Sequence, residues 1–159
     1  FSTLEAVIEH SVEITRALFS EYPETETLTR LIKSASELSQ TEDEDTRCIK
    51  QLGEGWVAEE TLAIAIYCAL KYEDSFEKAI IASVNHDGDS DSTGSVTGNV
   101  LGAWFGEGSI PQRFIDDLEL IDVIEEVAND LYNDCEMSEY SAYRDDIWKQ
   151  KYITSNFRL

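Results

Sequence analysis

The chain has 159 residues, of which 33 are Asp or Glu and 12 are Lys or Arg, so its formal net charge is −21. That length suits one domain with a core of its own, and 42% apolar residues exclude a disordered acidic tail. The negative charge argues against binding to nucleic acid or to an anionic membrane, because both need a basic face. It favours cationic partners, namely metal ions or basic proteins.

The three cysteines, Cys48, Cys68 and Cys135, are widely separated and have no metal-site spacing. We therefore expect three reduced and mostly buried thiols, which suits a reducing compartment and predicts a cytoplasmic protein. We expect no signal peptide, and the longest apolar run, Leu62–Leu70, is too short to cross a bilayer.

Apolar residues recur at three- and four-residue spacing almost throughout the chain, which predicts helices and no strand. In chain order, we expect helices over residues 4–18, 28–38, 58–72, 76–84, 93–105 and 121–131. Loops are predicted at the acidic run 41–45 and at 85–92. The helix over 121–131 is expected to bury its apolar side, which consists of Ile121, Ile124, Val127, Ala128 and Leu131.

Prolines and polar residues predict where some of these helices begin and end. Pro23 is expected to stop or redirect the chain after the first helix. The run Asp74-Ser75-Phe76-Glu77 is typical of a capping box with Asp74 as the cap, and Pro111 suits the first turn of another short helix.

The densest group of polar side chains is the run 85–94, with the sequence NHDGDSDSTG. Asp87, Asp89 and Asp91 stand at two-residue spacing, so their carboxylates can turn towards one hard cation such as Mg²⁺ or Ca²⁺. The alternative is an acidic loop that caps the following helix, with Asp91 or Ser92 accepting backbone N–H bonds. An EF-hand is excluded, because Ser92 stands where that calcium loop requires Gly.

Gly94, Gly98 and Gly102 follow at four-residue spacing and fall on one helical face. Each Gly costs about 1 kcal/mol relative to Ala inside a helix, so the stripe predicts the close approach of another helix or of a ligand. Close helix packing would place the aspartate loop deep in a helical bundle.

Two glycines, Gly53 and Gly55, flank a turn that projects Trp56 just ahead of a helix N-terminus. Backbone N–H groups in such a turn can hold a phosphate, although no complete P-loop or dinucleotide fingerprint is present. The alternative is a glycine turn followed by a core tryptophan.

These residues resemble a known family. The run DSDSTG at 89–94, followed by GNVLGA at 98–103, is similar to the C-terminal signature of the ADP-ribosylglycohydrolase family, typified by the bacterial dinitrogenase reductase-activating glycohydrolase. The block GWVAEE at 55–60 and the Ile110-Pro111 pair followed by Phe114 are also similar to that family. The matches follow the family's order over about residues 50–135.

The resemblance implies an all-α fold, a compact orthogonal helical bundle, with two Mg²⁺ ions (sometimes Mn²⁺) at the base of an ADP-ribose cleft. The family hydrolyses the glycosidic bond that joins ADP-ribose to a modified residue or small molecule. Carried over to this sequence, the resemblance makes Asp89 and Asp91 metal ligands and candidate catalytic residues, with Ser92 as a hydroxyl ligand.

The same resemblance places Gly55, Trp56 and Val57 against the ADP-ribose. Their backbone N–H groups would point towards the phosphates, and Trp56 would lie along the wall of the cleft. ADP-ribose or an ADP-ribosylated substrate is therefore the expected partner, and no nucleic acid or membrane is expected.

The sequence departs from the family pattern in two respects. Asp87 stands where the family usually has Gly or another small residue, and the family's other metal ligands, a Thr-Asp-Asp run, are absent from these residues. That run belongs to an N-terminal half, and the family's usual length is about twice this one. We therefore expect residues 1–159 to be a single all-α domain or the C-terminal half of a larger one. As a half, it would be inactive alone and would need the N-terminal half as its partner.

Two other functions stay open on the sequence. A non-catalytic relative would bind ADP-ribose, a metal or a basic protein without turnover. An acidic interaction module would bind a basic partner through its charge, without any need for Mg²⁺.

Two further features have local interpretations. For His86 we expect a local capping or packing role rather than acid–base catalysis. The slightly basic tail carries Tyr143, Trp148, Tyr152 and Phe157, and we expect it to pack within the chain. Covering the surface that a missing half leaves bare, or dimerisation, is the alternative for that tail.

Overall fold

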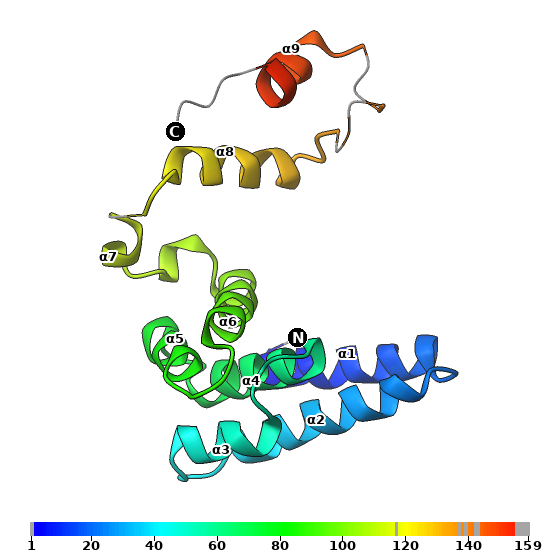
Figure 1. Cartoon of the computed structure of the whole chain (residues 1–159), viewed down its shortest axis with the longest axis vertical. Helices are drawn as coiled ribbons and strands as arrows, with labels where there is room; N and C mark the ends of the chain where they lie inside the picture. Colours follow the sequence, from blue (N-terminus) through cyan, green and yellow to red (C-terminus); the bar gives the residue numbers. More distant parts are fainter. Residues whose placement is uncertain (1, 117, 137, 139, 142–143, 155–159) are drawn as a thin grey trace. The chain divides into compact units, whose positions relative to one another are not determined.

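The computed structural model describes residues 2–116, 118–136, 138, 140–141 and 144–154. These residues form helices and turns but no strand, which confirms the predicted all-α class. The chain divides into two compact units, Phe1–Phe114 and Ile115–Leu159 (Figure 1). In the described part, no helix is both long and apolar enough to cross a membrane.

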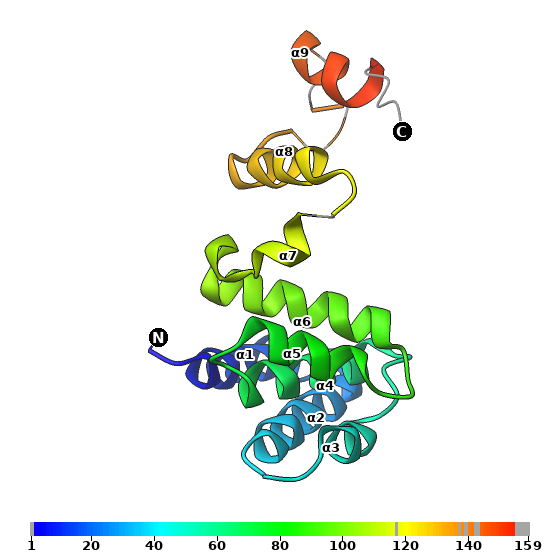
Figure 2. The same ribbon diagram turned by 90° about the vertical axis from the view of Figure 1, so that its left-hand side faces the viewer.

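The first unit contains six longer helices joined by short turns. They are α1 (Leu4–Phe19), α2 (Pro23–Ser39), α3 (Asp45–Leu52), α4 (Ala58–Lys71), α5 (Phe76–Val84) and α6 (Ser90–Phe105). The short helices η1 (Glu107–Ser109) and α7 (Gln112–Ile115) follow. Figure 2 shows α5 lying alongside α6, and the five helices predicted in this part of the chain are confirmed.

Several predicted boundaries are wrong. The chain is redirected after α1, as predicted, but Pro23 itself begins α2, five residues before the predicted start at residue 28, because its fixed φ and missing N–H suit a first helical turn. Ser75, not Asp74, caps α5, and its hydroxyl accepts a hydrogen bond from the Lys78 N–H at 3.4 Å. Helix α3 was not predicted. Asp45 is the last residue of the acidic run 41–45, which was interpreted as a loop, but it is also the first residue of α3.

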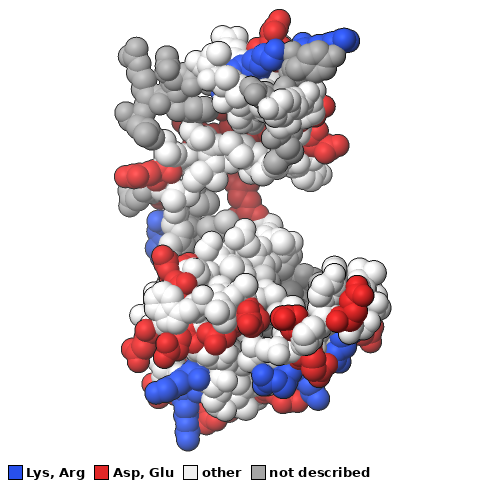
Figure 3. All heavy atoms as spheres, turned by 45° about the vertical axis from the view of Figure 1, so that its right-hand side comes forward, with Lys and Arg blue, Asp and Glu red and all other residues white. Residues whose placement is uncertain are grey.

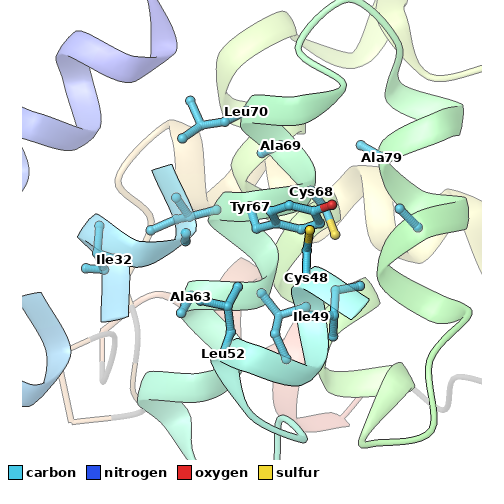
Figure 4. Packing of buried hydrophobic residues seen from close by; sticks show 14 of the residues in the cluster. Ile32, Cys48, Ile49, Leu52, Ala63, Tyr67, Cys68, Ala69, Leu70 and Ala79 are labelled. Carbon is cyan, nitrogen blue, oxygen red and sulfur yellow. The ribbon is translucent and has the colours of Figure 1, made fainter. Parts of the chain in front are cut away.

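The centre of the first unit is α4, which packs against α2, α3, α5 and α6. It buries nine residues on all its sides, which is typical of a core helix. Figure 4 shows Cys48 of α3 beside Tyr67 and Cys68 of α4. Both thiols are free and buried, as predicted, and burial raises the pKa of Cys68. Cys135 is also free but only half-buried.

A single carboxylate ties α3 to α4. The hydroxyls of Tyr67 and Tyr72 each donate to Asp45 at 2.7 Å, and the Lys71 ammonium lies 3.1 Å from the same carboxylate. Lys71 also donates to the carbonyl of Asp43 at 2.7 Å. Because Asp45 is the first residue of α3, these bonds fix where that helix begins against the core.

These contacts determine the charge state of Asp45. Burial alone would raise the pKa of Asp45, but the hydrogen bonds from Tyr67, Tyr72 and Lys71 together outweigh burial and lower it. Burial, and then the hydrogen bond to the same carboxylate, raise the pKa of Tyr72 to about 12. Asp45 is therefore ionised, and both tyrosines are protonated donors, at neutral pH.

We predict that Asp45 makes folding more stable at neutral pH than in acid. A lowered pKa means that its contribution is complete above the unfolded value of about 3.9 and is lost as the pH falls through the folded value. At pH ~6, Asp45→Asn should lower the free energy of unfolding by about 1–3 kcal/mol. Urea titrations should show this difference from the native chain shrinking below pH ~4. The exposed substitution Asp74→Asn should have little effect, and a pH-independent deficit for Asp45→Asn would contradict the assignment.

The second unit contains α8 (Ile121–Tyr132), α9 (Asp146–Lys149) and the π-helical turn η2 (Gln150–Thr154). The predicted burial of one side of α8 is wrong for the described residues: Ile124 is 47% exposed, Leu131 is 53% exposed, and no residue of the helix is buried. An apolar stripe is buried only where another layer packs on it, and the described residues of this unit form only short helices beside α8.

The aromatic tail packs within this unit, as predicted. The ring centroids of Trp148 and Tyr152 lie 5.2 Å apart, and the Trp148 indole donates to the carbonyl of Glu136 at 2.7 Å. Lys151 pairs with Glu126 at 2.8 Å and also with Asp130, and its hydrogen bond lowers the pKa of Asp130. Tyr143 and Phe157, which were part of the same prediction, lie outside the described residues.

Candidate functional site

An open groove of about 700 Å³ lies between the turn before α4 and the start of α6. All six site residues that the sequence suggests line this groove, together with five neighbours. The six are Gly55, Trp56, Val57, Asp89, Asp91 and Ser92. The fold thus brings two segments that are far apart in the sequence to one concave surface.

The turn before α4 owes its shape to two glycines and one carboxylate. Gly53 and Gly55 have φ of +132° and +80°, a region that other residues rarely adopt. The Glu60 carboxylate accepts the N–H groups of Glu54 and Gly55, both at 3.1 Å. The Thr61 hydroxyl donates to the Gly55 carbonyl at 2.7 Å, which fixes the turn to the first residues of α4.

This geometry changes the roles that the sequence suggests for the turn. The N–H of Gly55 does not face the groove as a free donor, because Glu60 accepts it. The N–H groups of Trp56 and Val57 remain, and Val57 is the N-cap of α4, where helical N–H groups lack intrahelical partners. Trp56 is 68% exposed, so the alternative of a core tryptophan is wrong.

The loop before α6 is held directly against this turn. The Asp89 N–H donates to the Glu54 carbonyl at 2.7 Å. A Cβ on Gly88 would lie 1.9 Å from the same carbonyl oxygen, so only glycine fits where the two backbones meet. The contact explains why Gly88 follows the first aspartate of the run.

His86 organises the interior of this loop. Its Nδ1 accepts the Gly88 N–H at 3.1 Å, and its Nε2 lies 2.9 Å from the Thr93 hydroxyl. That hydroxyl in turn donates to the Ser83 carbonyl at 2.6 Å, so the neutral tautomer with the proton on Nε2 satisfies all three bonds. His86 therefore has the local role that the sequence predicts for it.

The two candidate metal-ligating aspartates lie at the start of α6. The helix begins at Ser90, three residues earlier than predicted, so Asp91 and Ser92 lie in its first turn and not in a loop. Interactions with the Asp91 side chain, and then with the hydroxyl and N–H of Ser92, lower the pKa of Asp89. The Ser92 N–H also donates to the Asp91 carboxylate at 3.0 Å.

The expectation that these aspartates lie deep in the bundle is wrong. Asp91 is exposed, while Asp89 and Ser92 are half-buried at the edge of the groove. The glycine stripe of α6 packs closely only at its start: a Cβ on Gly94 would lie 2.6 Å from Val84 of α5, whereas one on Gly102 would meet nothing within 4 Å. Helix α5 therefore supports the first turns of α6, which is where the aspartates are.

The comparison with protein families covers most of the chain. The ADP-ribosylglycohydrolase family matches residues 2–141. The chain belongs to this family. It is also 32% identical over 107 residues to an uncharacterized protein of Archaeoglobus fulgidus. That match covers 66% of this chain but only 33% of the relative, and no solved structure matches the chain.

The groove offers oxygen donors of the type that hard cations prefer. Asp89, Asp91 and Ser92 contribute carboxylates and a hydroxyl. Among the described residues, no group of three or more His, Cys, Asp or Glu side chains could hold a metal ion. These three residues thus fit part of a Mg²⁺ shell, and the remaining ligands would have to come from water, substrate or another segment.

Sequence reasoning missed some residues of the groove. Ser95 and Thr61 both line it, and Ser95 stands four residues after Asp91 and three after Ser92. That spacing places Ser95 on the same helical face as Asp91 and Ser92. A prediction that began the helix at Ser90 would therefore have included Ser95 in the site. The role of Glu60 was not available, because it depends on the positive φ of the preceding glycines.

We predict that Gly88→Ala distorts the groove. The added methyl group would meet the backbone of Glu54, which cannot move without breaking the hydrogen bond to Asp89. The free energy of unfolding should fall by about 1–3 kcal/mol in urea titrations. Gly108→Ala is the matched control, because its Cβ would meet nothing within 4 Å and it should change stability little. Equal effects of the two substitutions would contradict the close contact.

Proposed function

We propose that this chain forms one wall of an ADP-ribosyl hydrolase site whose activity depends on Mg²⁺, or on Mn²⁺ in its place. The observation that supports it most is that residues from both family segments line one groove, namely Gly55, Trp56 and Val57 from one and Asp89, Asp91 and Ser92 from the other. Asp89, Asp91 and Ser92 would bind the metal, with the two aspartates in the catalytic role. The turn at Gly55, Trp56 and Val57 would hold the ADP-ribose.

The size and lining of the groove suit this ligand. About 700 Å³ falls within the usual range of pockets for small molecules and cofactors, roughly 300–1,000 Å³. Val57, Ala58, Leu62 and Val96 supply an apolar surface, and the exposed ring of Trp56 offers a flat face for a ribose or a base. The N–H groups ahead of α4 are suitable donors to a phosphate.

Charge explains why this site would need a cation. The pyrophosphate of ADP-ribose and the carboxylates of Asp89 and Asp91 are all negative, so they repel one another in the same groove. A pair of bound Mg²⁺ ions would offset that repulsion and activate a water for attack on the anomeric carbon. The chain's own part is to hold the ions at Asp89, Asp91 and Ser92 and to orient the ADP-ribose along the turn.

The chain spans about a third of the curated relative that it matches. The hydrolytic site would therefore be completed by the part of the family fold that carries the Thr-Asp-Asp ligands, and the isolated chain would be inactive. The substrate, an ADP-ribosylated protein residue or small molecule, would enter from the open side of the groove.

In a family-length polypeptide that contains this chain, we predict that Asp89→Asn or Asp91→Asn removes ADP-ribosyl hydrolysis. Either change replaces a negatively charged carboxylate at the groove with a neutral amide, which is a weaker ligand for Mg²⁺. Turnover at saturating Mg²⁺ should therefore fall at least about 100-fold. Asp87→Asn is the matched control, because Asp87 does not line this groove, and its turnover should stay within about twofold of the native value. Full turnover by both Asp89→Asn and Asp91→Asn would refute the proposal.

We also predict that Trp56→Ala weakens binding of ADP-ribose without weakening the fold. Because the side chain is 68% exposed, the free energy of unfolding should change by less than about 0.5 kcal/mol. Loss of a stacking face should weaken binding of ADP-ribose about tenfold in calorimetry with Mg²⁺ present. Tyr132→Ala, which removes another exposed ring, should leave binding unchanged.

The second candidate function is binding without turnover. It is favoured by the incomplete set of metal ligands. Among the described residues, no group of three or more His, Cys, Asp or Glu side chains could hold a metal ion. The family-length polypeptide decides between the two, because binding of ADP-ribose with no hydrolysis in the presence of Mg²⁺ would support the non-catalytic function.

A further inference from the structure

Two adjoining apolar grooves run beside α1 in the first unit, with volumes of about 420 and 580 Å³. We call them together the α1 surface. The larger groove is lined by the end of α1, the start of α2 and the start of α4, and the smaller by α1, α2, α4 and α6. Thr15, Leu28 and Leu62 line both grooves, so they form one continuous surface.

The α1 surface exposes large apolar side chains of the kind that are usually buried in a protein core. Phe19 is 49% exposed and Tyr22 is 54% exposed, and both line the larger groove. Helix α1 itself buries only Leu4 among its sixteen residues. Contiguous apolar surface of this kind is typical of a site where another polypeptide or a ligand binds.

This surface is continuous with the candidate site. Ala58 and Leu62 line both the larger α1 groove and the groove that holds Asp89 and Asp91. A segment that filled the α1 surface would therefore reach the open side of the candidate site. The metal ligands that the proposed site lacks would have to be supplied from this open side.

Charge restricts what can occupy the surface. Glu24 and Glu59 are the only charged residues among those that line the two grooves, and neither forms an ion pair among the described residues. Acidic side chains are also widespread on the face drawn in Figure 3. Covering these carboxylates without a cationic partner would be costly, so the occupant should carry Lys or Arg beside its apolar face. A second copy of this chain, with a net charge of −21, is a poor match.

We propose that the α1 surface docks a helical segment of the ADP-ribosylglycohydrolase fold that lies outside these 159 residues. The length of the relative supports this occupant, since the match covers only 33% of it and leaves enough polypeptide for a further helical layer. The segment presents an apolar face to Phe19, Tyr22 and Leu62 and a basic flank to Glu24 and Glu59. The docking partner rests on the proposed function, because it is the same segment that would complete the metal shell.

The probe for this docking is the part of the Archaeoglobus fulgidus relative that its match to this chain leaves out, purified as a separate polypeptide. Biolayer interferometry should detect its binding to the native chain. The double substitution Phe19→Asp with Tyr22→Asp should weaken that binding at least tenfold. Ile81→Asp is the matched control, since Ile81 on α5 is 50% exposed but lines neither groove, and its binding should be unchanged.

A second pair of variants tests the basic flank. Glu24→Lys with Glu59→Lys should weaken binding at least fivefold, while Glu73→Lys, on the exposed turn after α4, should not. Raising NaCl from about 50 to about 500 mM should weaken binding of the native chain and not that of the Glu24→Lys, Glu59→Lys variant.

The result separates docking from the proposed function. Asp89→Asn should bind the probe as well as the native chain does, even though the proposed function requires that carboxylate for hydrolysis. Docking without hydrolysis would overturn the proposed function alone. Docking itself would be overturned by absence of binding of a probe whose circular dichroism spectrum shows that it is folded and helical, or by equal loss in the Ile81→Asp control. Light scattering that shows a dimer of this chain broken by Phe19→Asp with Tyr22→Asp would also overturn it.

Discussion

The backbone hydrogen bond from the Asp89 N–H to the Glu54 carbonyl joins the two segments that line the candidate groove. It requires the backbones to approach so closely that Gly88 has no room for a Cβ. On one side of this bond lies the turn that carries Trp56, and on the other lies the first turn of α6 with its aspartates. This bond fixes the glycine turn to the start of α6, while the packing of α4 on α6 holds the two sides of the groove together.

The rest of the first unit holds the two segments in place. The Asp45 carboxylate fixes α3 to α4, and α3 leads directly into the glycine turn. Glu60 and Thr61, from the start of α4, bond to that turn from the other side. His86 and Thr93 close the loop before α6 onto the end of α5. Polar groups in these places fix the geometry of a site that is otherwise open to solvent.

Much of this arrangement was predictable, because helical periodicity depends on local spacing. The buried helix α4 and the glycine-rich start of α6 follow from residue pattern alone, and the family resemblance selected the residues that line one groove. The start of α6 was misplaced because Ser90 and Asp91 are as typical of loops as of first helical turns. The prediction that α8 buries one side was wrong, because an apolar stripe on one helix does not specify whether another layer covers it.

Other features depend on contacts that no local pattern encodes. In the sequence, Glu60 resembles any acidic residue in the first turn of a helix. In the structure, its carboxylate accepts hydrogen bonds from two N–H groups of the turn. Asp45 stands in an acidic run that resembles a solvated loop, yet it accepts two tyrosine hydroxyls. The apolar character of Phe19 and Tyr22 is evident from sequence, whereas their exposure beside the candidate site is known only from the fold.

We propose above all that the groove between the turn and α6 binds ADP-ribose together with Mg²⁺. Amide chemical shifts of the ¹⁵N-labelled chain, followed during titration with ADP-ribose in the presence of Mg²⁺, test it most directly. We expect changes at Trp56, Val57, Ser92 and Ser95 that are lost with EDTA and in the Asp89→Asn, Asp91→Asn variant. Changes confined to other parts of the chain, or changes that persist without the metal and both aspartates, would contradict it.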